Sequence, residues 1–316
     1  MTYSSGGLIQ ATDYNGFVST TAGANVNATW NTTYGQTAVG TVSAAGTVTA
    51  TQWASLVNTI SSQASHQGTT ITARSAPTTG TLVSVLAAVN TDVTNTYNNR
   101  YQAVAVGSQF TGWSGTNSKT AATSGATWTI TFTNTVTFAS SAAAQYFFNA
   151  GGLVKIDVAK SATGQTGDPE WNDLATTLCG DIWISGLASA HSIAGTSYTG
   201  VTKIGGTGTP TTLTTGNGWD ALTAGGAAVI VYKQFADTAP YTANFIQHSL
   251  EKNAGSTALT ITTLWSASDG DPISGGTAAS GATPGTAPCT IATYYPPSTT
   301  YLSASWGTPS VAATTA

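Results

Sequence analysis

The sequence predicts a mainly β protein with a few helices (α+β). A helix-containing N-terminal module over 1–100 is expected to precede an antiparallel, β-sandwich-like body over 101–316. Three observations support this: apolar residues recur at helical spacing in the first hundred residues, they alternate with threonine beyond them, and glycine, threonine and proline separate the later segments. Hydrophobic residues make up 41% of the 316 residues, enough to bury sizeable cores.

An internal repeat organises the N-terminal module. Residues 7–20 match residues 46–59 in a frame of glycine, an aliphatic residue, Ala-Thr, an aromatic residue, a large apolar residue, valine and threonine. Thr12 and Thr51 each stand just before the apolar residues, where a helix N-cap belongs. We therefore expect a helix after Thr51 that stops at Gly68, and a shorter helix after Thr12.

A further helix is expected over about 81–97. Apolar side chains recur there on one helical face, at Leu82, Leu86, Val89, Val93 and Tyr97. These helical faces would pack on each other within the chain or, in a trimer, on copies in neighbouring subunits.

Alternation of apolar residues with threonine predicts the first strand of the body over 128–138. A short helix or turn is expected over 139–149, with a stop at Gly151 and Gly152. More strands are expected at 154–158, 227–235, 243–251 and 258–265.

The remaining segments of the body carry turn and loop signals. Asp-Pro at the start of 168–178 is typical of a helix N-terminus. Residues 196–226 are rich in glycine and threonine and predict a surface excursion, and 274–288 predict a long exposed loop. The tail over 294–306 combines prolines with aromatic residues that can anchor it.

Charged residues make up only 6% of the chain, against about 25% in an ordinary soluble protein. Two classes of protein tolerate such a surface: the secreted adhesive domain, and the subunit of a large assembly whose surface is covered by neighbours. The 8 basic residues are scattered and the net charge is −4, which argues against direct nucleic-acid binding.

No export or membrane signal is visible in the sequence. The N-terminus lacks the charged and apolar regions of a secretory signal, and no run of about 18 apolar residues occurs. A protein of a virus particle, made in the host cytoplasm and released by lysis, fits this combination. Cys179 and Cys289 are far apart and are expected to be separate thiols, with a disulfide left open.

Sequence motifs of catalysis are missing, and we predict no enzyme, no cofactor and no metal. His66, His191 and His248 are expected to be structural or surface residues. A nucleophile assembled from Cys179 and His191 is the alternative, but neither residue stands in a motif that would activate the thiol.

Carboxylates gather around the helix expected at 168–178, at Asp168, Glu170, Asp173 and Asp181. Acidic residues near a helix N-terminus stabilise it, which is the structural interpretation. The alternative is the carboxylate pair of a polysaccharide depolymerase. The segment 269–272 (Asp-Gly-Asp-Pro) is typical of a turn, with calcium ligation as the alternative.

Four tryptophans in surroundings rich in glycine, serine and threonine are candidates for an interaction surface: Trp113, Trp183, Trp219 and Trp306. Exposed aromatic rings contribute strongly to protein and carbohydrate interfaces. Core packing is the alternative for each of them.

Three segments resemble virion structural proteins of tailed phages, of the type found in phages of cyanobacteria. They are 49–56 with 66–68, 143–152 with its Tyr-Phe-Phe-Asn-Ala-Gly-Gly signature, and 240–244 preceded by 232–235. Ala54 and Ser55 depart from the family pattern. The residues that we expect to form a packing signature are Trp53, Leu56, Tyr146, Phe147, Phe148, Asn149, Gly151 and Gly152.

The resemblance implies a virion component of the tail, neck or baseplate region, including fibre-like appendages, that acts in assembly or host attachment. Its expected partners are copies of itself, with a trimer as one arrangement, other virion proteins and a host-surface glycan. Three alternatives stay open: a capsid decoration protein, a carbohydrate-binding receptor-binding protein and a polysaccharide depolymerase.

Overall fold

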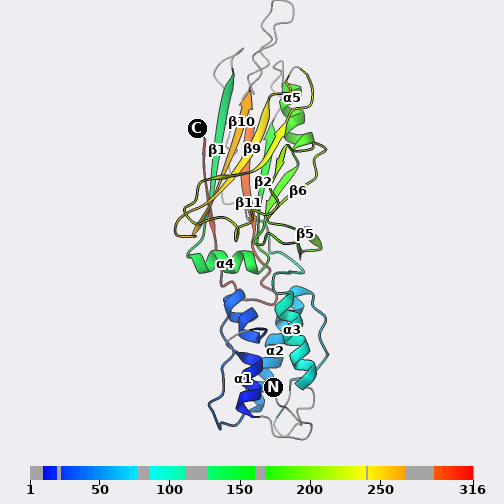
Figure 1. Ribbon diagram of the computed structural model, residues 1–316, viewed down its shortest axis with the longest axis vertical. Helices are drawn as coiled ribbons and strands as arrows, with labels where there is room; N and C mark the ends of the chain where they lie inside the picture. The colour runs from blue at the N-terminus through cyan, green and yellow to red at the C-terminus, as the bar shows by residue number, and fades with distance from the viewer. Residues whose placement is uncertain are drawn as a thin grey trace, which may run out of the picture.

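The computed structural model describes residues 10–19, 23–76, 78, 86–110, 127–160, 168–239, 241–267 and 288–315. The molecule is elongated, with a helical part at one end and a β body at the other (Figure 1). The prediction of a mainly β protein with a few helices is confirmed. Within the described residues, no helix is both long and apolar enough to cross a membrane.

The helical part contains three α-helices and one short π-helix, which surround a common core. They are α1 (Ala11–Val18), η1 (Ala28–Thr33), α2 (Ala50–Gln67) and α3 (Leu86–Asn98). Both α1 and α2 pack against α3 within the chain. The two copies of the internal repeat meet in this core, because the equivalent residues Tyr14 and Trp53 have ring centroids 6.0 Å apart.

The helix starts differ from the prediction by two residues. Thr49, not Thr51, is the N-cap of α2: its hydroxyl accepts from the N–H of Gln52, and the Gln52 side chain accepts from the N–H of Thr49. This reciprocal capping box decides the start. In α1 the N-cap is likewise Gln10 rather than Thr12. Gly68 ends α2 as predicted, with a left-handed φ of 73°.

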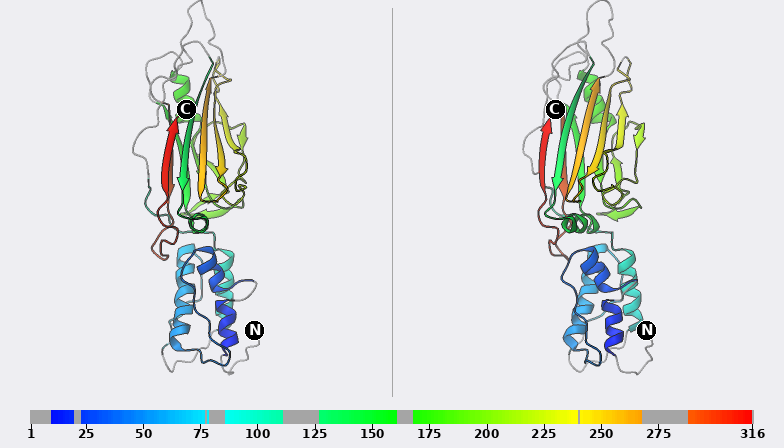
Figure 2. Two further views of the ribbon diagram at one scale, coloured as in Figure 1. Left: turned by 90° about the vertical axis from the view of Figure 1, so that its left-hand side faces the viewer. Right: turned by 60° about the vertical axis from the view of Figure 1, so that its left-hand side comes forward.

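The β body is a sandwich of two antiparallel sheets (Figure 2). The larger sheet has the order β12-β1-β10-β9-β8-β7, with bounds β1 (Trp128–Thr137), β7 (Thr212–Leu213), β8 (Val229–Phe235), β9 (Phe245–Lys252), β10 (Ala258–Ala267) and β12 (Ser310–Thr315). The smaller sheet has the order β11-β2-β3-β6, with bounds β2 (Leu153–Lys160), β3 (Asp181–Ile184), β6 (Val201–Ile204) and β11 (Pro288–Tyr295). The strands predicted by alternation all form, because one face of each is buried between the sheets.

Shorter elements complete the body. They are α4 (Ser141–Asn149), α5 (Asp168–Asp173), the π-helix η2 (Leu174–Leu178) and the hairpin of β4 (His191–Ile193) and β5 (Thr196–Tyr198). The expectation that 196–226 is only a surface excursion is wrong, since Val201, Trp219 and Leu222 from it are buried in the core. Its strands have two to four residues, too short to show alternation in the sequence. Most of the loop expected at 274–288 lies outside the described residues.

The Tyr-Phe-Phe-Asn-Ala-Gly-Gly segment lies where the two parts of the molecule meet. Figure 1 shows α4 lying across the long axis between them. Phe147 and Phe148 point into the body, where Phe148 stacks on Trp219 at a centroid distance of 5.2 Å. Asn149 at the end of the helix reaches the other way and donates to the carbonyl of Thr33 at 3.1 Å.

The two glycines after α4 allow a close approach at this junction. Gly151 has a φ of +90°, and a Cβ added there would lie 2.6 Å from the Cβ of Ala103. A Cβ on Gly152 would lie 2.5 Å from the ring of Phe147. Tyr34, which belongs to the first hundred residues, is part of the core of the β body. A domain boundary at residue 100 therefore stays a prediction.

Replacing Gly151 with alanine is expected to lower the free energy of unfolding by about 2–4 kcal/mol, because strain at positive φ adds to a clash with the Cβ of Ala103. Gly195→Ala is the matched control. Gly195 has a φ of +80° but open space around it, so the loss there should be about 1 kcal/mol. Urea unfolding of both variants measures the difference, and equal losses would show that the close approach to Ala103 contributes nothing.

Candidate functional site

The four tryptophans predicted to form an interaction surface do not form one surface in the structure. Trp219 and Trp306 are buried, which contradicts their assignment to an interaction surface. Trp113 lies outside the described residues, and Trp183 is half-buried. The small and polar residues next to Trp219 in the sequence suggested an exposed ring. The ring is buried because the backbone is held against the body, where the N–H of Trp219 donates to the carbonyl of Ser185 at 3.0 Å.

Trp183 belongs to an aromatic and charged face on the outer side of the smaller sheet. The alternation of β3 turns Ile182 and Ile184 into the core and Trp183 outward. Its ring lies between two tyrosines, with centroids 5.1 Å from Tyr295 and 6.0 Å from Tyr198. This cluster of three rings is what we call the Trp183 face.

Charged groups border the Trp183 face. Lys155 on β2 is opposite Trp183 in the strand register, and its Nζ lies 5.6 Å from the indole centroid. The same Nζ is 2.8 Å from Asp157 Oδ1 and 3.7 Å from Asp181 Oδ2. Burial, with Asp181 nearby, raises the pKa of Asp157 to about 6 against the opposing effect of Lys155. Such a face combines half-buried aromatic rings, tilted to one another, with donors and acceptors, which suits a ligand such as a sugar ring.

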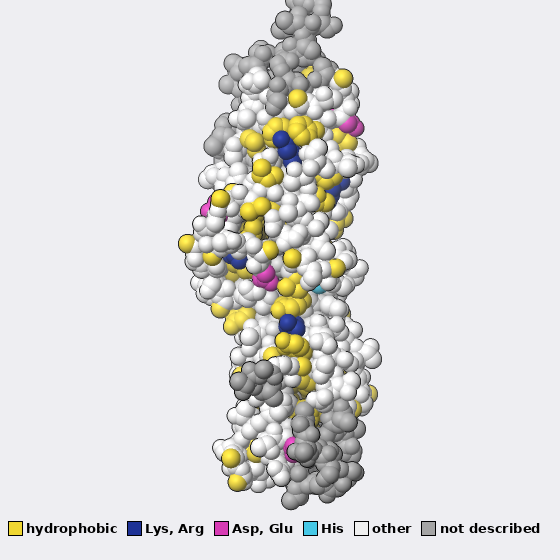
Figure 3. All heavy atoms as spheres, in the orientation of Figure 1, with side chains coloured by type: hydrophobic (Ala, Val, Ile, Leu, Met, Phe, Trp, Pro, Cys, Tyr) yellow, Lys and Arg dark blue, Asp and Glu magenta, His cyan; other side chains and the backbone are white. Residues whose placement is uncertain are grey.

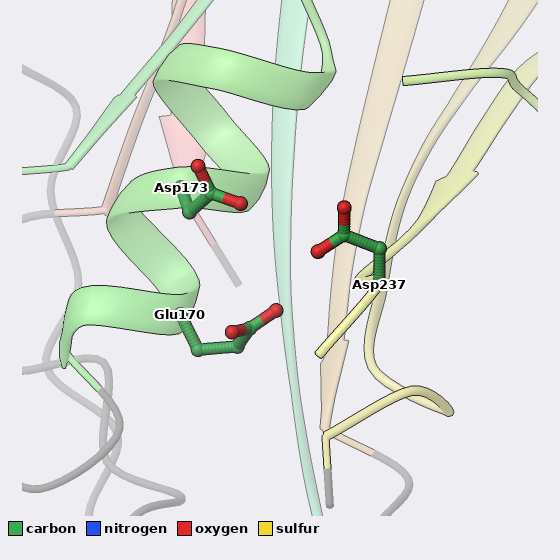
Figure 4. Close-up of side chains that lie close together, drawn as sticks. All are labelled: Glu170, Asp173 and Asp237. Atoms are coloured by element: carbon green, nitrogen blue, oxygen red, sulfur yellow. The ribbon is translucent and has the colours of Figure 1, made fainter. Parts of the chain in front are cut away.

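The carboxylates around α5 divide between two places. Asp181 belongs to the Lys155 pair, whereas Glu170 and Asp173 face Asp237, which follows β8 (Figure 4). Ligand oxygens of these three residues lie within 4.8 Å of one another. Sequence reasoning missed Asp237 because nothing in the spacing links it to α5, and only the tertiary fold brings the segments together. The side chain of Asp168 and the segment 269–272 lie outside the described residues.

His66, His191 and His248 are buried, which fits the structural rather than the surface role among the two that we expected for them. Burial lowers the pKa of His66 to about 4 and that of His248 to about 3, and it also lowers the pKa of His191. His66 is neutral and its Nε2 donates to the carbonyl of Ala150 at 3.1 Å. His248 lies inside the larger sheet, with Nδ1 2.9 Å from the hydroxyl of Thr263.

Both cysteines are buried, and no disulfide joins Cys179 to Cys289. Burial raises the pKa of Cys179 to about 12, so its thiol stays protonated. A thiolate nucleophile needs a lowered pKa and access to solvent. The pairing of Cys179 with His191 as a catalytic unit therefore has no support in this geometry.

Comparisons with known proteins add no assignment. No protein-family model, curated protein or solved structure matches the chain. The resemblance to tailed-phage virion proteins thus stays a prediction from the three sequence segments.

The buried histidines predict a loss of stability in acid. A histidine whose pKa falls from about 6.5 in the unfolded chain to about 4 in the folded protein stabilises the fold above pH 6.5 and loses that contribution as the pH falls. For His66 the loss between pH 7 and pH 5 is about 2 kcal/mol. Gln at this position can still donate to Ala150, so His66→Gln should reduce the pH dependence of urea unfolding by that amount and leave the contributions of His191 and His248. A variant that retains the full pH dependence would show that His66 is not the titrating group.

Proposed function

We propose that this chain is a structural protein of a tailed-phage particle, in the tail, neck or baseplate region, and that it acts in assembly or host attachment without catalysis. The observation that carries the proposal is an uncharged sheet edge on an elongated, charge-poor molecule. Figure 3 shows charged side chains spread thinly over one face, among uncharged and apolar ones. Such a surface favours contact with neighbouring subunits, because few charges must be desolvated.

The uncharged edge is the outer side of β12. This strand is the last in the order of the larger sheet, where it pairs with β1 (Figure 2). Proteins that remain monomeric protect sheet edges with lysine, proline, bulges or very short strands. The sequence of β12, Ser-Val-Ala-Ala-Thr-Thr, contains neither charge nor proline.

The opposite edge of the same sheet is protected. Its last strand, β7, has only two residues, and the neighbouring β8–β9 pair has a register shift between Ile230 and Tyr232. Short edge strands and bulges discourage pairing with another chain. The contrast between the two edges favours β12 as the edge that pairs in the assembly, with a second copy or with another virion protein.

The positions of the reactive side chains agree with a role without catalysis. The histidines are buried and neutral, and Cys179 is protonated. One hollow of the described residues, at the ends of β1 and β10, is lined by 127–129, Ser266 and Ala267, which include no carboxylate, whereas Glu170 and Asp173 face Asp237 elsewhere. A polysaccharide depolymerase would need two carboxylates in a cleft that admits the sugar chain.

The Trp183 face favours a second candidate function, the binding of a host-surface glycan. The half-buried rings of Trp183 and Tyr295, with a lysine and two carboxylates at their border, form a surface that can stack on a sugar and hydrogen-bond to its hydroxyl groups, while Tyr198 is buried beside Trp183. This function is compatible with a structural role, since attachment proteins of particles do both.

A positive charge on β12 is expected to weaken assembly. Ala312 is exposed on this strand, and Ala312→Lys should shift the purified protein from a homo-oligomer toward the monomer, as measured by light scattering after size exclusion. Ala188→Lys, in an exposed loop after β3, is the control with the same change of charge. A monomeric wild type, or an oligomer that survives in Ala312→Lys, would contradict pairing through β12.

Loss of the Trp183 ring tests the glycan function. If the wild type binds a sugar on a glycan array, Trp183→Ala should weaken that binding about tenfold or more, because a central aromatic ring carries much of the affinity of such a surface. Tyr301→Ala removes an exposed ring outside the Trp183 face and should leave binding unchanged. No binding by the wild type, or equal affinity in both variants, would exclude this face as a glycan site.

A further inference from the structure

Glu170, Asp173 and Asp237 converge at the end of the β body that lies far from the helical part (Figures 1 and 4). Glu170 and Asp173 lie on α5, and Asp237 lies on the connection between β8 and β9. The close-up shows the carboxylate of Asp237 pointing toward the other two across a narrow gap. Two segments that are distant in the sequence therefore present their charges to each other.

No positive side chain among the described residues balances these three charges. The ion pairs of the described residues join Arg74 to Asp92, and Lys155 to Asp157 and Asp181. The chain has only 12 acidic residues, and three of them meet here. Like charges at this distance repel one another and destabilise the fold unless a cation lies between them.

A second observation points to a ligand. Glu170 is nine-tenths buried as a residue, at 9% exposure, and its Oε1 has no hydrogen-bond partner among the described residues. Thr238 hydrogen-bonds to the carboxyl group but leaves Oε1 unpartnered. Figure 4 shows the carboxylate of Glu170 directed toward the gap that it shares with Asp173 and Asp237. A buried, unpartnered carboxylate oxygen is unfavourable, and a metal ion in the gap would satisfy it.

We propose that Glu170, Asp173 and Asp237 bind a calcium ion that ties α5 to the β8–β9 connection. Calcium takes oxygen ligands at about 2.3–2.6 Å, so two ligands on opposite sides of the ion lie about 4.6–5.2 Å apart. The three ligand oxygens lie within 4.8 Å of one another, so a single calcium ion can contact all three. Calcium accepts a flexible coordination geometry, whereas magnesium demands a near-ideal octahedron, which favours calcium at a site formed by two separate segments.

The site has a closed and an open side. Glu170 is buried, Asp173 is half-buried and Asp237 is exposed, so the ion can reach the gap from solvent and keep water on its outer side. The ion would hold α5 against the sheet, where Trp171, the neighbour of Glu170, stacks on Trp265 at a centroid distance of 5.7 Å. Binding to the folded state alone would stabilise this end of the body. The inference is independent of the proposed role in a particle.

Thermal unfolding of the full chain tests the proposal, with calcium chloride or EGTA added. Calcium should raise the Tm of the wild type, and more than magnesium does. Asp237→Asn should weaken calcium affinity about tenfold or more in a calorimetric titration. Glu251→Gln, an exposed change of the same charge on β9, should bind calcium like the wild type.

The order of stability should reverse with the ion. In EGTA, Asp237→Asn should be at least as stable as the wild type because one repelling charge is gone, and in calcium the wild type should be more stable. Terbium luminescence sensitised by tryptophan gives a readout independent of stability, and calcium should displace it in the wild type. The proposal is overturned if calcium leaves the wild-type Tm unchanged, if magnesium stabilises more than calcium, or if both variants bind calcium equally.

Discussion

The elongated molecule depends on buried polar contacts that hold its two parts together at the turn after α4. The main chain of this turn accepts a hydrogen bond from His66 on α2, and Asn149 at the end of α4 donates to Thr33 in the helical part. Neither contact tolerates displacement, because a buried polar group that loses its partner is costly. Gly151 allows the turn after α4 to approach Ala103 closely, as both of these hydrogen bonds require. The segment that resembles phage virion proteins is thus a structural joint and carries no reactive group.

Much of the fold could be predicted from the sequence, because periodicity reports burial directly. The alternation of apolar residues with threonine in β1 predicts which face of the strand is buried. In α2, the spacing of Trp53, Leu56 and Ile60 likewise predicts the buried face of the helix. The candidate sites were harder. Trp219 is surrounded in sequence by small polar residues, yet tertiary folding buries it against Phe148. Asp237 has no local signal, since its partners on α5 are distant in the sequence and meet it only across the folded body.

The scarcity of charge gives the few charges that are present more significance. Lys155 with its two aspartates borders the half-buried ring of Trp183, and the carboxylates of Glu170, Asp173 and Asp237 meet without a cation among the described residues. Under the proposed function, the remaining charge-poor surface contacts other subunits, and the edge strand β12, which has neither charge nor proline, is the part least suited to a solitary protein.

The most direct measurement is electron microscopy of particles purified from the source of this chain, labelled with an antibody raised against it. The proposal predicts label on the tail, neck or baseplate, in a few to some dozens of copies per particle. Label over the capsid would contradict that position and make the chain a decoration protein. Intact particles without label, together with abundant protein in the infected lysate, would contradict a structural role altogether.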